Sequence, residues 1–245
     1  MHAIEVTEIG GPEVLNYVDQ PQPSPGPGQV LIKAEAIGVN FIDTYFRSGH
    51  YPRELPFVPG TEVAGTVAAV GDGVTALGLD DRVVTAAASG AYAEFTTAPA
   101  QLVARVPSAV GFDTAASALL KGMTAHYLIK SVYPAQPGDT VLVHAGAGGV
   151  GLILTQWAAS LAVRVITTVS TPAKAELSRQ AGATDVLDYP GDDPDEFGAR
   201  IRSLTAGDGV AAVYDGVGAS TFEASLASLA VRGTLALFGA ASGPV

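Results

Sequence analysis

The sequence contains no cysteine among its 245 residues. This absence excludes disulfide bonds, thiol catalysis, iron–sulfur clusters and any zinc site held by thiolates. It leaves the redox compartment open, because a chain without cysteine suits every compartment.

Charged residues, and basic ones above all, are also scarce. They make up 15% of the chain, whereas an average domain has about 25%. The 13 Lys and Arg face 24 Asp and Glu, for a formal net charge of -11, which argues against nucleic acid and anionic membranes as partners. No apolar run reaches the roughly 18 residues of a membrane span, and the first residues do not form a signal peptide. We therefore expect a cytoplasmic protein.

Two different patterns divide the chain. Up to about residue 110, short alternating or apolar runs such as 30–36 and 62–70 are separated by Gly and Pro clusters, which is typical of a β-rich barrel or sandwich. Beyond that point, helical spacing over 115–132 is followed by strand candidates that alternate with helical segments, the rhythm of a parallel sheet. These strand candidates are 140–145, 164–169, 185–187, 211–214 and 234–238. We predict two domains, over residues 1–118 and 119–245.

A GxGxxG motif directly follows the first of these strand candidates, as Gly146-Ala147-Gly148-Gly149-Val150-Gly151. Apolar residues then recur at helical spacing up to Leu161, so the motif opens a helix, as the dinucleotide-binding fold requires. In that fold Gly146 permits the tight turn, Gly148 lets the backbone approach a pyrophosphate, and Gly151 allows close helix–strand contact. The alternative is a glycine-rich turn without a ligand.

The end of the second strand candidate bears on the choice of nucleotide. NAD-specific folds place an acidic residue about 20 residues past the glycines. Here the strand ends on Val169-Ser170-Thr171-Pro172-Ala173-Lys174, which offers two hydroxyls and a cation. A cation attracts the 2′-phosphate that a carboxylate would repel, so the sequence favours NADPH over NADH. The alternative is that Lys174 is a solvated helix residue.

Five segments carry a family resemblance: 39–49, 59–62, 120–128, 144–151 and 238–243. The first holds the most specific pattern, Asn-x-x-Asp-x-x-x-Arg-x-Gly from Asn40 to Gly49. Together they resemble the zinc-independent, zeta-crystallin-like quinone oxidoreductases of the medium-chain dehydrogenase/reductase superfamily, and the likeness runs along nearly the whole chain. Zinc-dependent alcohol dehydrogenases of that superfamily carry a Cys near position 40 and a His before the Glu of Gly-His-Glu, where this chain has Asn40 and Thr61. Alcohol oxidation is therefore disfavoured.

The resemblance implies a GroES-like β-barrel domain on the substrate side of a cleft and a Rossmann domain that binds NADPH. Carried over by position, Tyr45 and Tyr51 would line the substrate pocket. The cofactor would meet Asn40 and Thr124 at the nicotinamide, Gly148, Gly149 and Val150 at the pyrophosphate, Ser170, Lys174 and Tyr189 at the 2′-phosphate, and Phe238 with Gly239 at the nicotinamide ribose. Asp43 and Arg47 are expected to hold their loop together as an exposed pair.

The predicted function is NADPH-dependent reduction of quinones by hydride transfer, with the Asn40 amide and the Tyr45 hydroxyl stabilising the charge that the quinone receives. Two alternatives stay open: a reductase of α,β-unsaturated carbonyl compounds, and a non-catalytic protein that binds NADPH. No metal is expected, because the acidic cluster 192–196 is interpreted as a helix cap, and His144 and His126 are interpreted as structural.

The end of the sequence departs from the family pattern. Family members continue through another strand and a segment that returns to the first domain, whereas this sequence stops at Val245, soon after the fifth parallel strand candidate. We therefore expect a Rossmann domain that lacks its C-terminal end. Because relatives pair their subunits through that strand, the homodimer implied by the resemblance is left open.

Overall fold

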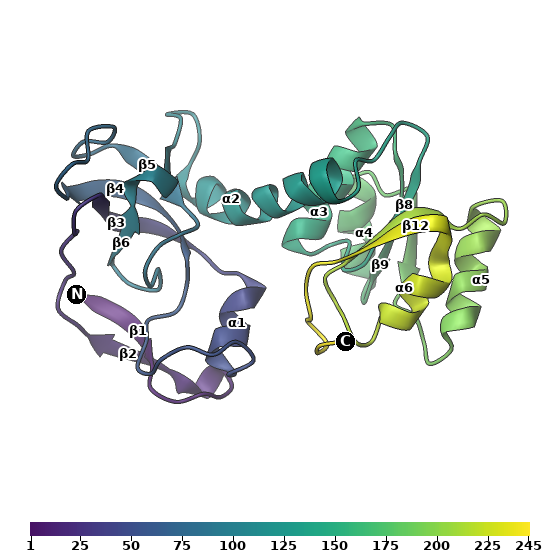
Figure 1. Ribbon diagram of the computed structural model, residues 1–245, viewed down its shortest axis with the longest axis horizontal. Coiled ribbons are helices and arrows are strands. Elements are labelled where there is room, and N and C mark those ends of the chain that lie inside the picture. The colour runs from purple at the N-terminus through teal and green to yellow at the C-terminus, as the bar shows by residue number, and fades with distance from the viewer. The chain divides into compact units, whose positions relative to one another are not determined.

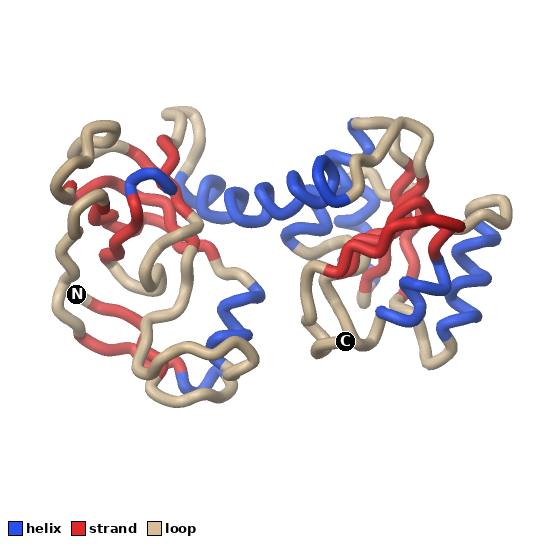
Figure 2. Tube along the Cα trace, in the orientation of Figure 1, coloured by secondary structure: helices blue, strands red, loops and turns tan.

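The chain divides into two units, Met1–Leu120 and Lys121–Val245. The structure is a computed structural model that describes residues 1–245. Helices and strands are labelled in Figure 1 and distinguished by colour in Figure 2. In chain order the elements are β1 (His2–Val6), η1 (Pro12–Val14), β2 (Leu15–Asp19), β3 (Gln29–Gly38), α1 (Phe41–Arg47), β4 (Glu62–Val70), β5 (Arg82–Thr85), β6 (Phe95–Pro99), η2 (Ala100–Leu102), β7 (Val103–Arg105), α2 (Phe112–Tyr127), the π-helical turn η3 (Leu128–Val132), β8 (Thr140–Val143), α3 (Gly149–Ser160), β9 (Arg164–Val169), α4 (Pro172–Gln180), β10 (Asp185–Asp188), α5 (Pro194–Leu204), β11 (Val210–Asp215), α6 (Phe222–Ser228) and β12 (Leu229–Leu237).

The first unit is built on a five-stranded antiparallel sheet with the strand order β6-β3-β4-β5-β7. Alternate residues such as Val30 and Ile32 on β3 and Val63 on β4 are fully buried in one core, as the two-residue period of a strand requires. Irregular pairing at two places along β3 and β4 is of the kind that bends a sheet. The predicted β-rich architecture of this half is confirmed.

The second unit contains a parallel sheet with the strand order β10-β9-β8-β11-β12. Counted from β8 along the chain, this is the order 3-2-1-4-5 of a doubly wound fold. In such folds ligands bind at the carboxyl ends of the strands, where the strand order reverses. Here that switch point lies between β8 and β11.

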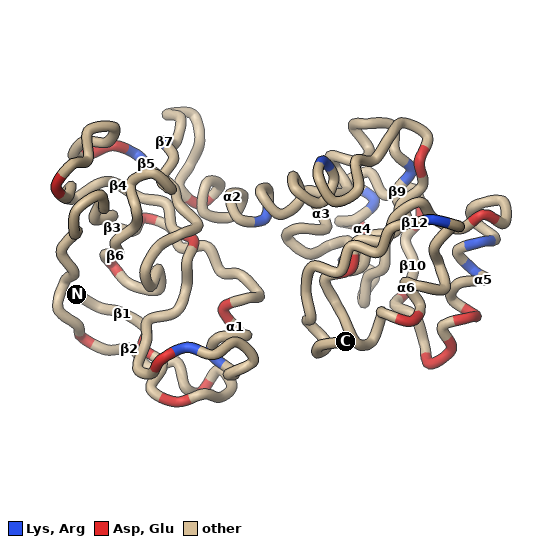
Figure 3. The backbone as a smooth tube through the Cα atoms, in the orientation of Figure 1, with Lys and Arg blue, Asp and Glu red and all other residues tan.

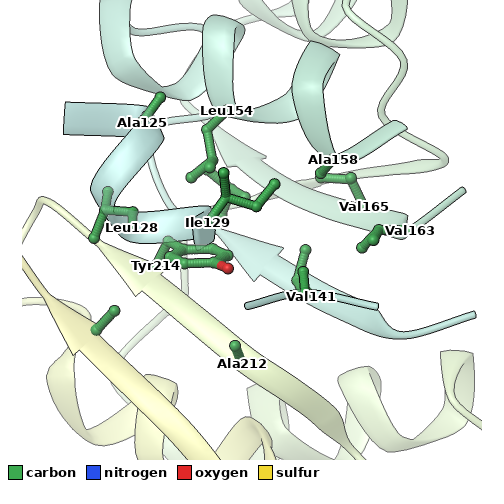
Figure 4. Close-up of a cluster of buried hydrophobic side chains, with 13 residues drawn as sticks. Ala125, Leu128, Ile129, Val141, Leu154, Ala158, Val163, Val165, Ala212 and Tyr214 are labelled. Carbon is green, nitrogen blue, oxygen red and sulfur yellow. The ribbon is translucent and has the colours of Figure 1, made fainter. Parts of the chain in front are cut away.

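Both faces of the parallel sheet are covered by helices. On one face Leu128 and Ile129 of η3 and Leu154 of α3 gather around the ring of Tyr214, which is fully buried on β11 (Figure 4). On the other face, residues of α5 and α6 pack against the alternate residues of the same strands, such as Leu142. Buried residues on both faces explain why these strands read as nearly continuous apolar runs in the sequence.

Two ends of the parallel strands differ from the sequence prediction by more than one residue, each for a local reason. β8 ends at Val143 because Ala145 takes the left-handed conformation with φ 53, which turns the chain out of the sheet. β12 begins at Leu229, before the predicted residue 234, because the 94% exposed Val231 and the left-handed Arg232 interrupt the apolar pattern without ending the strand.

The acidic cluster 192–196 forms the start of α5. Asp193 Oδ1 accepts hydrogen bonds from the backbone N–H groups of Asp195, at 3.0 Å, and of Glu196, at 3.2 Å. Acidic residues lie in the first turn of this helix and Arg202 lies in its last turn (Figure 3), the distribution that a helix dipole favours. The interpretation of this cluster as a helix cap is confirmed. None of the helices combines the length and apolar character that crossing a membrane requires.

Candidate functional site

The glycine motif forms the turn between β8 and α3, at the switch point of the parallel sheet. A Cβ on Gly146 would lie 2.4 Å from the Cβ of Thr167 on β9, and a Cβ on Gly151 would lie 2.3 Å from the Ala145 carbonyl oxygen. Side chains are therefore excluded at both positions. The prediction that Gly146 permits the turn needs correction, because the left-handed residue is Ala145 and Gly146 is required instead by the close approach to β9.

The first turn of α3 presents an open backbone. Gly148 is the N-cap residue, no side chain caps the helix, and both Gly148 and Gly149 are exposed. The side chain of Lys121 on α2 lies against this turn, with its Cε 3.0 Å from the position of a Cβ on Gly149. Val150 is half-buried and packs on the core. Open N–H groups at the positive end of a helix fit a pyrophosphate.

Ser170 and Lys174 are brought together at the carboxyl end of β9. The Nζ of Lys174 donates to the Ser170 Oγ at 3.0 Å, and both residues are exposed. The backbone N–H of Lys174 donates to the Thr171 Oγ1 at 3.2 Å, which caps α4. An ammonium and a hydroxyl thus stand where an NAD-specific fold has a carboxylate.

Tyr189 follows β10 and lies against the glycine turn. Its ring stacks on that of His144, with centroids 6.4 Å apart and an interplanar angle of 13°. Its hydroxyl interacts with the backbone N–H of Ala145, and burial raises the pKa of Tyr189 above its usual range. The hydroxyl is therefore neutral at physiological pH.

Phe238 and Gly239, directly after β12, pack on the turn that follows β11. The Phe238 N–H donates to the Asp215 carbonyl at 2.9 Å. A Cβ on Gly216 would lie 2.9 Å from the Phe238 ring, and a Cβ on Gly239 would lie 2.6 Å from the Gly216 carbonyl oxygen. Close backbone contact therefore fixes this predicted nicotinamide-ribose segment.

A buried polar network connects three of the parallel strands with α6. His144 Nδ1 lies 2.8 Å from the Thr168 Oγ1, and His144 Nε2 lies 3.0 Å from the Ser225 Oγ. Ser225 in turn donates to the Asp215 Oδ2 at 2.7 Å. Burial lowers the pKa of His144 to about 4, against a smaller opposing effect of the Asp215 charge, so the imidazole is neutral. The expectation of a hydrogen-bonded structural His144 is confirmed.

In the first unit, Asn40 stands at the N-terminus of α1 and is 7% exposed. Its Nδ2 donates to the Glu62 Oε2 at 2.8 Å, and the Glu62 Oε1 accepts from the Leu120 N–H at 2.8 Å. Glu62 is fully buried at the start of β4. A Cβ on Gly38 would lie 2.3 Å from the Glu62 Oε2, so the glycine at the end of β3 makes room for this carboxylate.

Asp43 and Arg47 stabilise α1, but not as the exposed pair that the sequence predicts. Asp43 is 6% exposed, and its Oδ2 accepts from the Asn40 N–H and from the Tyr92 hydroxyl, each at 3.0 Å. Arg47 Nε donates to the Gly10 carbonyl at 3.3 Å. The structural interpretation of both residues is confirmed, whereas the exposure of Asp43 was wrong because its carboxylate caps the helix.

Tyr45 and Tyr51 belong to one aromatic cluster on and after α1. Their ring centroids are 5.2 Å apart, and Tyr45 also lies 5.5 Å from Phe41 and 5.1 Å from His50. Phe41 is 55% exposed and Tyr51 is 41% exposed, so the cluster offers aromatic faces to a ligand. Thr124 lies in the second unit, half-buried on α2, beside Ala125 of the core.

Four residues that take part in these arrangements were missed in the sequence: Glu62, Tyr92, Asp215 and Ser225. The local sequence holds a signal for Glu62, because a single acidic residue opens the otherwise uncharged run 62–70, and a charge in such a run needs a buried partner. The others have partners 10 to 81 residues away and leave no local signal.

Two family descriptions match the chain. "Alcohol dehydrogenase GroES-like domain" matches residues 26–108, and "Zinc-binding dehydrogenase" matches residues 149–245. The expected GroES-like domain is thereby confirmed. No group of three or more His, Cys, Asp or Glu side chains is placed to hold a metal, and the Asn40 amide donates a hydrogen bond to the Glu62 carboxylate.

Individual relatives match along almost the whole chain. A quinone oxidoreductase of Pseudomonas aeruginosa is 46% identical over 244 residues, 99% of this chain and 74% of that protein. A 2-haloacrylate reductase of a Burkholderia species is 43% identical over 249 residues, 98% of this chain and 74% of that protein. A mycobacterial protein solved in complex with NADPH matches with a TM-score of 0.98 at 74% identity, covering 100% of this chain and 76% of that one. The chain therefore belongs to the quinone oxidoreductase family of the medium-chain dehydrogenase/reductase superfamily.

Proposed function

We propose that this protein is an NADPH-dependent reductase of quinones that works without zinc. The observation that carries the proposal is the Ser170–Lys174 pair beside the open glycine turn, which suits a nucleotide with a 2′-phosphate. The quinone oxidoreductase and the NADPH complex among its relatives support the same activity.

The second unit would hold the cofactor along the carboxyl ends of its strands. The N–H groups at Gly149 and Val150 would bind the pyrophosphate, and Gly148, whose own N–H donates to the Ala145 carbonyl at 2.8 Å, would let the pyrophosphate approach the backbone. Ser170, Lys174 and Tyr189 would meet the 2′-phosphate, and Phe238 with Gly239 would meet the nicotinamide ribose, with Thr124 at the nicotinamide. When bound, NADPH would supply a hydride from C4 of its nicotinamide ring. The task of the chain is then to orient the reactants and to exclude water.

Residues of the first unit would bind the acceptor. The exposed rings of Phe41 and Tyr51, with the half-buried Tyr45 between them in the cluster, suit offset stacking with a flat quinone ring. The Asn40 amide, whose nitrogen the buried Glu62 carboxylate orients, and the Tyr45 hydroxyl would donate hydrogen bonds to the oxygens on which negative charge develops. Water would supply the single proton that, with the hydride, completes the hydroquinone.

The second candidate function is reduction of α,β-unsaturated carbonyl compounds. The similarity to a 2-haloacrylate reductase favours it. Both reactions use the same cofactor and the same hydride step, and they differ in whether the hydride goes to a quinone or to the β-carbon of a conjugated double bond.

The test is a comparison of kcat/KM for NADPH oxidation with a simple benzoquinone, a naphthoquinone, an enone and 2-chloroacrylate. Higher values for the quinones are expected; higher values for the last two would establish the second candidate instead. Asn40→Ala and Tyr45→Phe should each lower kcat with the quinone at least about tenfold, since a lost donor to a developing charge costs about 10²–10³ in favourable cases. NADPH binding without turnover on any acceptor would favour the non-catalytic alternative. Location in the cytoplasm and assembly as a homodimer stay predictions from the sequence.

A further inference from the structure

A buried histidine stands at the switch point of the parallel sheet. His144 follows β8, Thr168 lies near the end of β9, and Asp215 ends β11. His144 is 1% exposed, and Thr168, Asp215 and Ser225 are 0% exposed. The hydrogen bonds among them therefore join three neighbouring strand ends out of contact with solvent.

The chemistry of these groups fixes the direction of every hydrogen bond. The Asp215 carboxylate only accepts, so Ser225 uses its single hydroxyl proton on it. The Ser225 oxygen must then accept from His144 Nε2. Because the ring is neutral, Nδ1 carries no proton and accepts from the Thr168 hydroxyl. The result is the Nε2–H tautomer of His144.

Each part of this network adjoins a segment of the proposed NADPH site. His144 directly precedes the glycine turn and stacks on Tyr189. The Thr168 carbonyl accepts from the Gly146 N–H at 3.0 Å, and two residues later stands Ser170. Asp215 Oδ1 accepts from the N–H groups of the turn 217–218, which adjoins the Phe238 segment.

We propose that His144, as the neutral Nε2–H tautomer, is a positioning residue for the dinucleotide: it couples the ends of β8, β9 and β11 and so holds the three cofactor-facing segments in register. This inference rests on the proposed function. A preformed site spares the ligand the cost of ordering it. Loosening the network should therefore weaken the binding of NADPH and of NADH alike. The segments that the network holds include those proposed to face the pyrophosphate and the nicotinamide ribose, which both nucleotides share.

Binding of both nucleotides to matched variants tests the proposal. Thr168→Val removes the donor to Nδ1 at nearly constant volume, and Ser225→Ala removes the acceptor for Nε2–H. Each should raise the Kd of NADPH and of NADH about tenfold, the effect of one unsatisfied buried group. Two variants serve as controls. Thr168→Ser keeps the hydroxyl, and Ser228→Ala removes a buried hydroxyl from α6, the helix of Ser225, that donates at 2.6 Å to the Ala224 carbonyl of the same helix. The Kd values of both controls should stay within about twofold of wild type.

The outcomes separate this inference from the proposed function. Wild-type protein that binds no NADPH overturns both. A second outcome is that the wild-type protein binds NADPH and that Thr168→Val and Ser225→Ala bind it with the same Kd as the controls. This outcome leaves the proposed function intact and overturns the positioning role, even if the two variants have lowered melting temperatures. If Ser225→Ala does not fold, Thr168→Val decides alone.

The tautomer is measured separately on the wild-type protein by two-bond ¹H–¹⁵N correlation NMR. The signal of His144 is assigned by its loss in His144→Gln. An Nε2–H pattern that does not change between pH 5.5 and 8 is expected. An Nδ1–H pattern, or a ring that titrates in this range, overturns the inference.

Discussion

Replacing Lys174 by Ala should weaken the binding of NADPH but not that of NADH. At about 4 Å, a pair of unit charges contributes about 1 kcal/mol in water and about 4 kcal/mol at an effective dielectric constant of 20. The Lys174–Ser170 pair is exposed, so the lower part of this range applies, about 1–2 kcal/mol, or a roughly five- to thirtyfold increase in Kd. NADH lacks the 2′-phosphate, and its Kd should change less than about twofold. The N-cap of α4 is retained, because Lys174 donates to Thr171 through its backbone N–H.

The assay is a fluorescence titration of each nucleotide at low and at high salt. Lys33→Ala is the matched control, because it removes the same charge from an exposed strand position in the first unit. The loss for NADPH should shrink at high salt, since exposed charge pairs are screened. Equal losses for NADPH and NADH, or an effect of Lys33→Ala as large as that of Lys174→Ala, would refute the assignment of the 2′-phosphate to this pair.

Three further outcomes follow from the structure. Gly148→Val changes an exposed N-cap residue and should raise the Kd of NADPH at least about tenfold with little change in melting temperature, because the valine side chain fills the space of the pyrophosphate. An unchanged Kd would contradict the assignment of the pyrophosphate to the glycine turn. Gly38→Ala places a Cβ 2.3 Å from the Glu62 Oε2 and should destabilise the protein by about 1–3 kcal/mol in urea unfolding, whereas Gly122→Ala, where a Cβ meets nothing within 4 Å, should not. His144 has a pKa of about 4 in the folded chain against 6.5 in the unfolded one, so between these pH values only the unfolded state binds the proton. Lowering the pH from 7 to 4 should therefore remove about 3 kcal/mol from the free energy of unfolding. Equal slopes of the free energy of unfolding against pH for wild type and His144→Gln would contradict this.

Much of the second unit could be predicted because its signals are local. Strands buried on both faces give apolar runs, and β9 has the bounds that the sequence predicts. The glycine turn is predicted from the GxGxxG spacing together with the apolar strand before it and the helical pattern after it, all of which are local. The choice of Ser170 and Lys174 as candidates for the 2′-phosphate also rests on a local signal, because both residues stand in the short segment that follows β9 and opens α4.

The contacts that organise the site could not be predicted, because they join distant parts of the chain. Glu62 reaches Asn40 across 22 residues and Leu120 across 58, and His144 reaches Ser225 across 81. Periodicity records which face of an element is apolar, not which polar groups meet inside the fold. Asp43 shows the same limit: spacing indicates a partner in Arg47, while burial and the Tyr92 hydroxyl depend on a loop 49 residues away.

The central claim is most directly tested by turnover of the purified 245-residue chain with NADPH and, in parallel, NADH, with a simple benzoquinone as acceptor. We expect one NADPH to be consumed for each hydroquinone formed, with kcat/KM for NADPH at least about fivefold above that for NADH, the effect of one exposed phosphate contact. NADPH that binds but is not oxidised by any quinone, or an equal preference for NADH, would contradict the account.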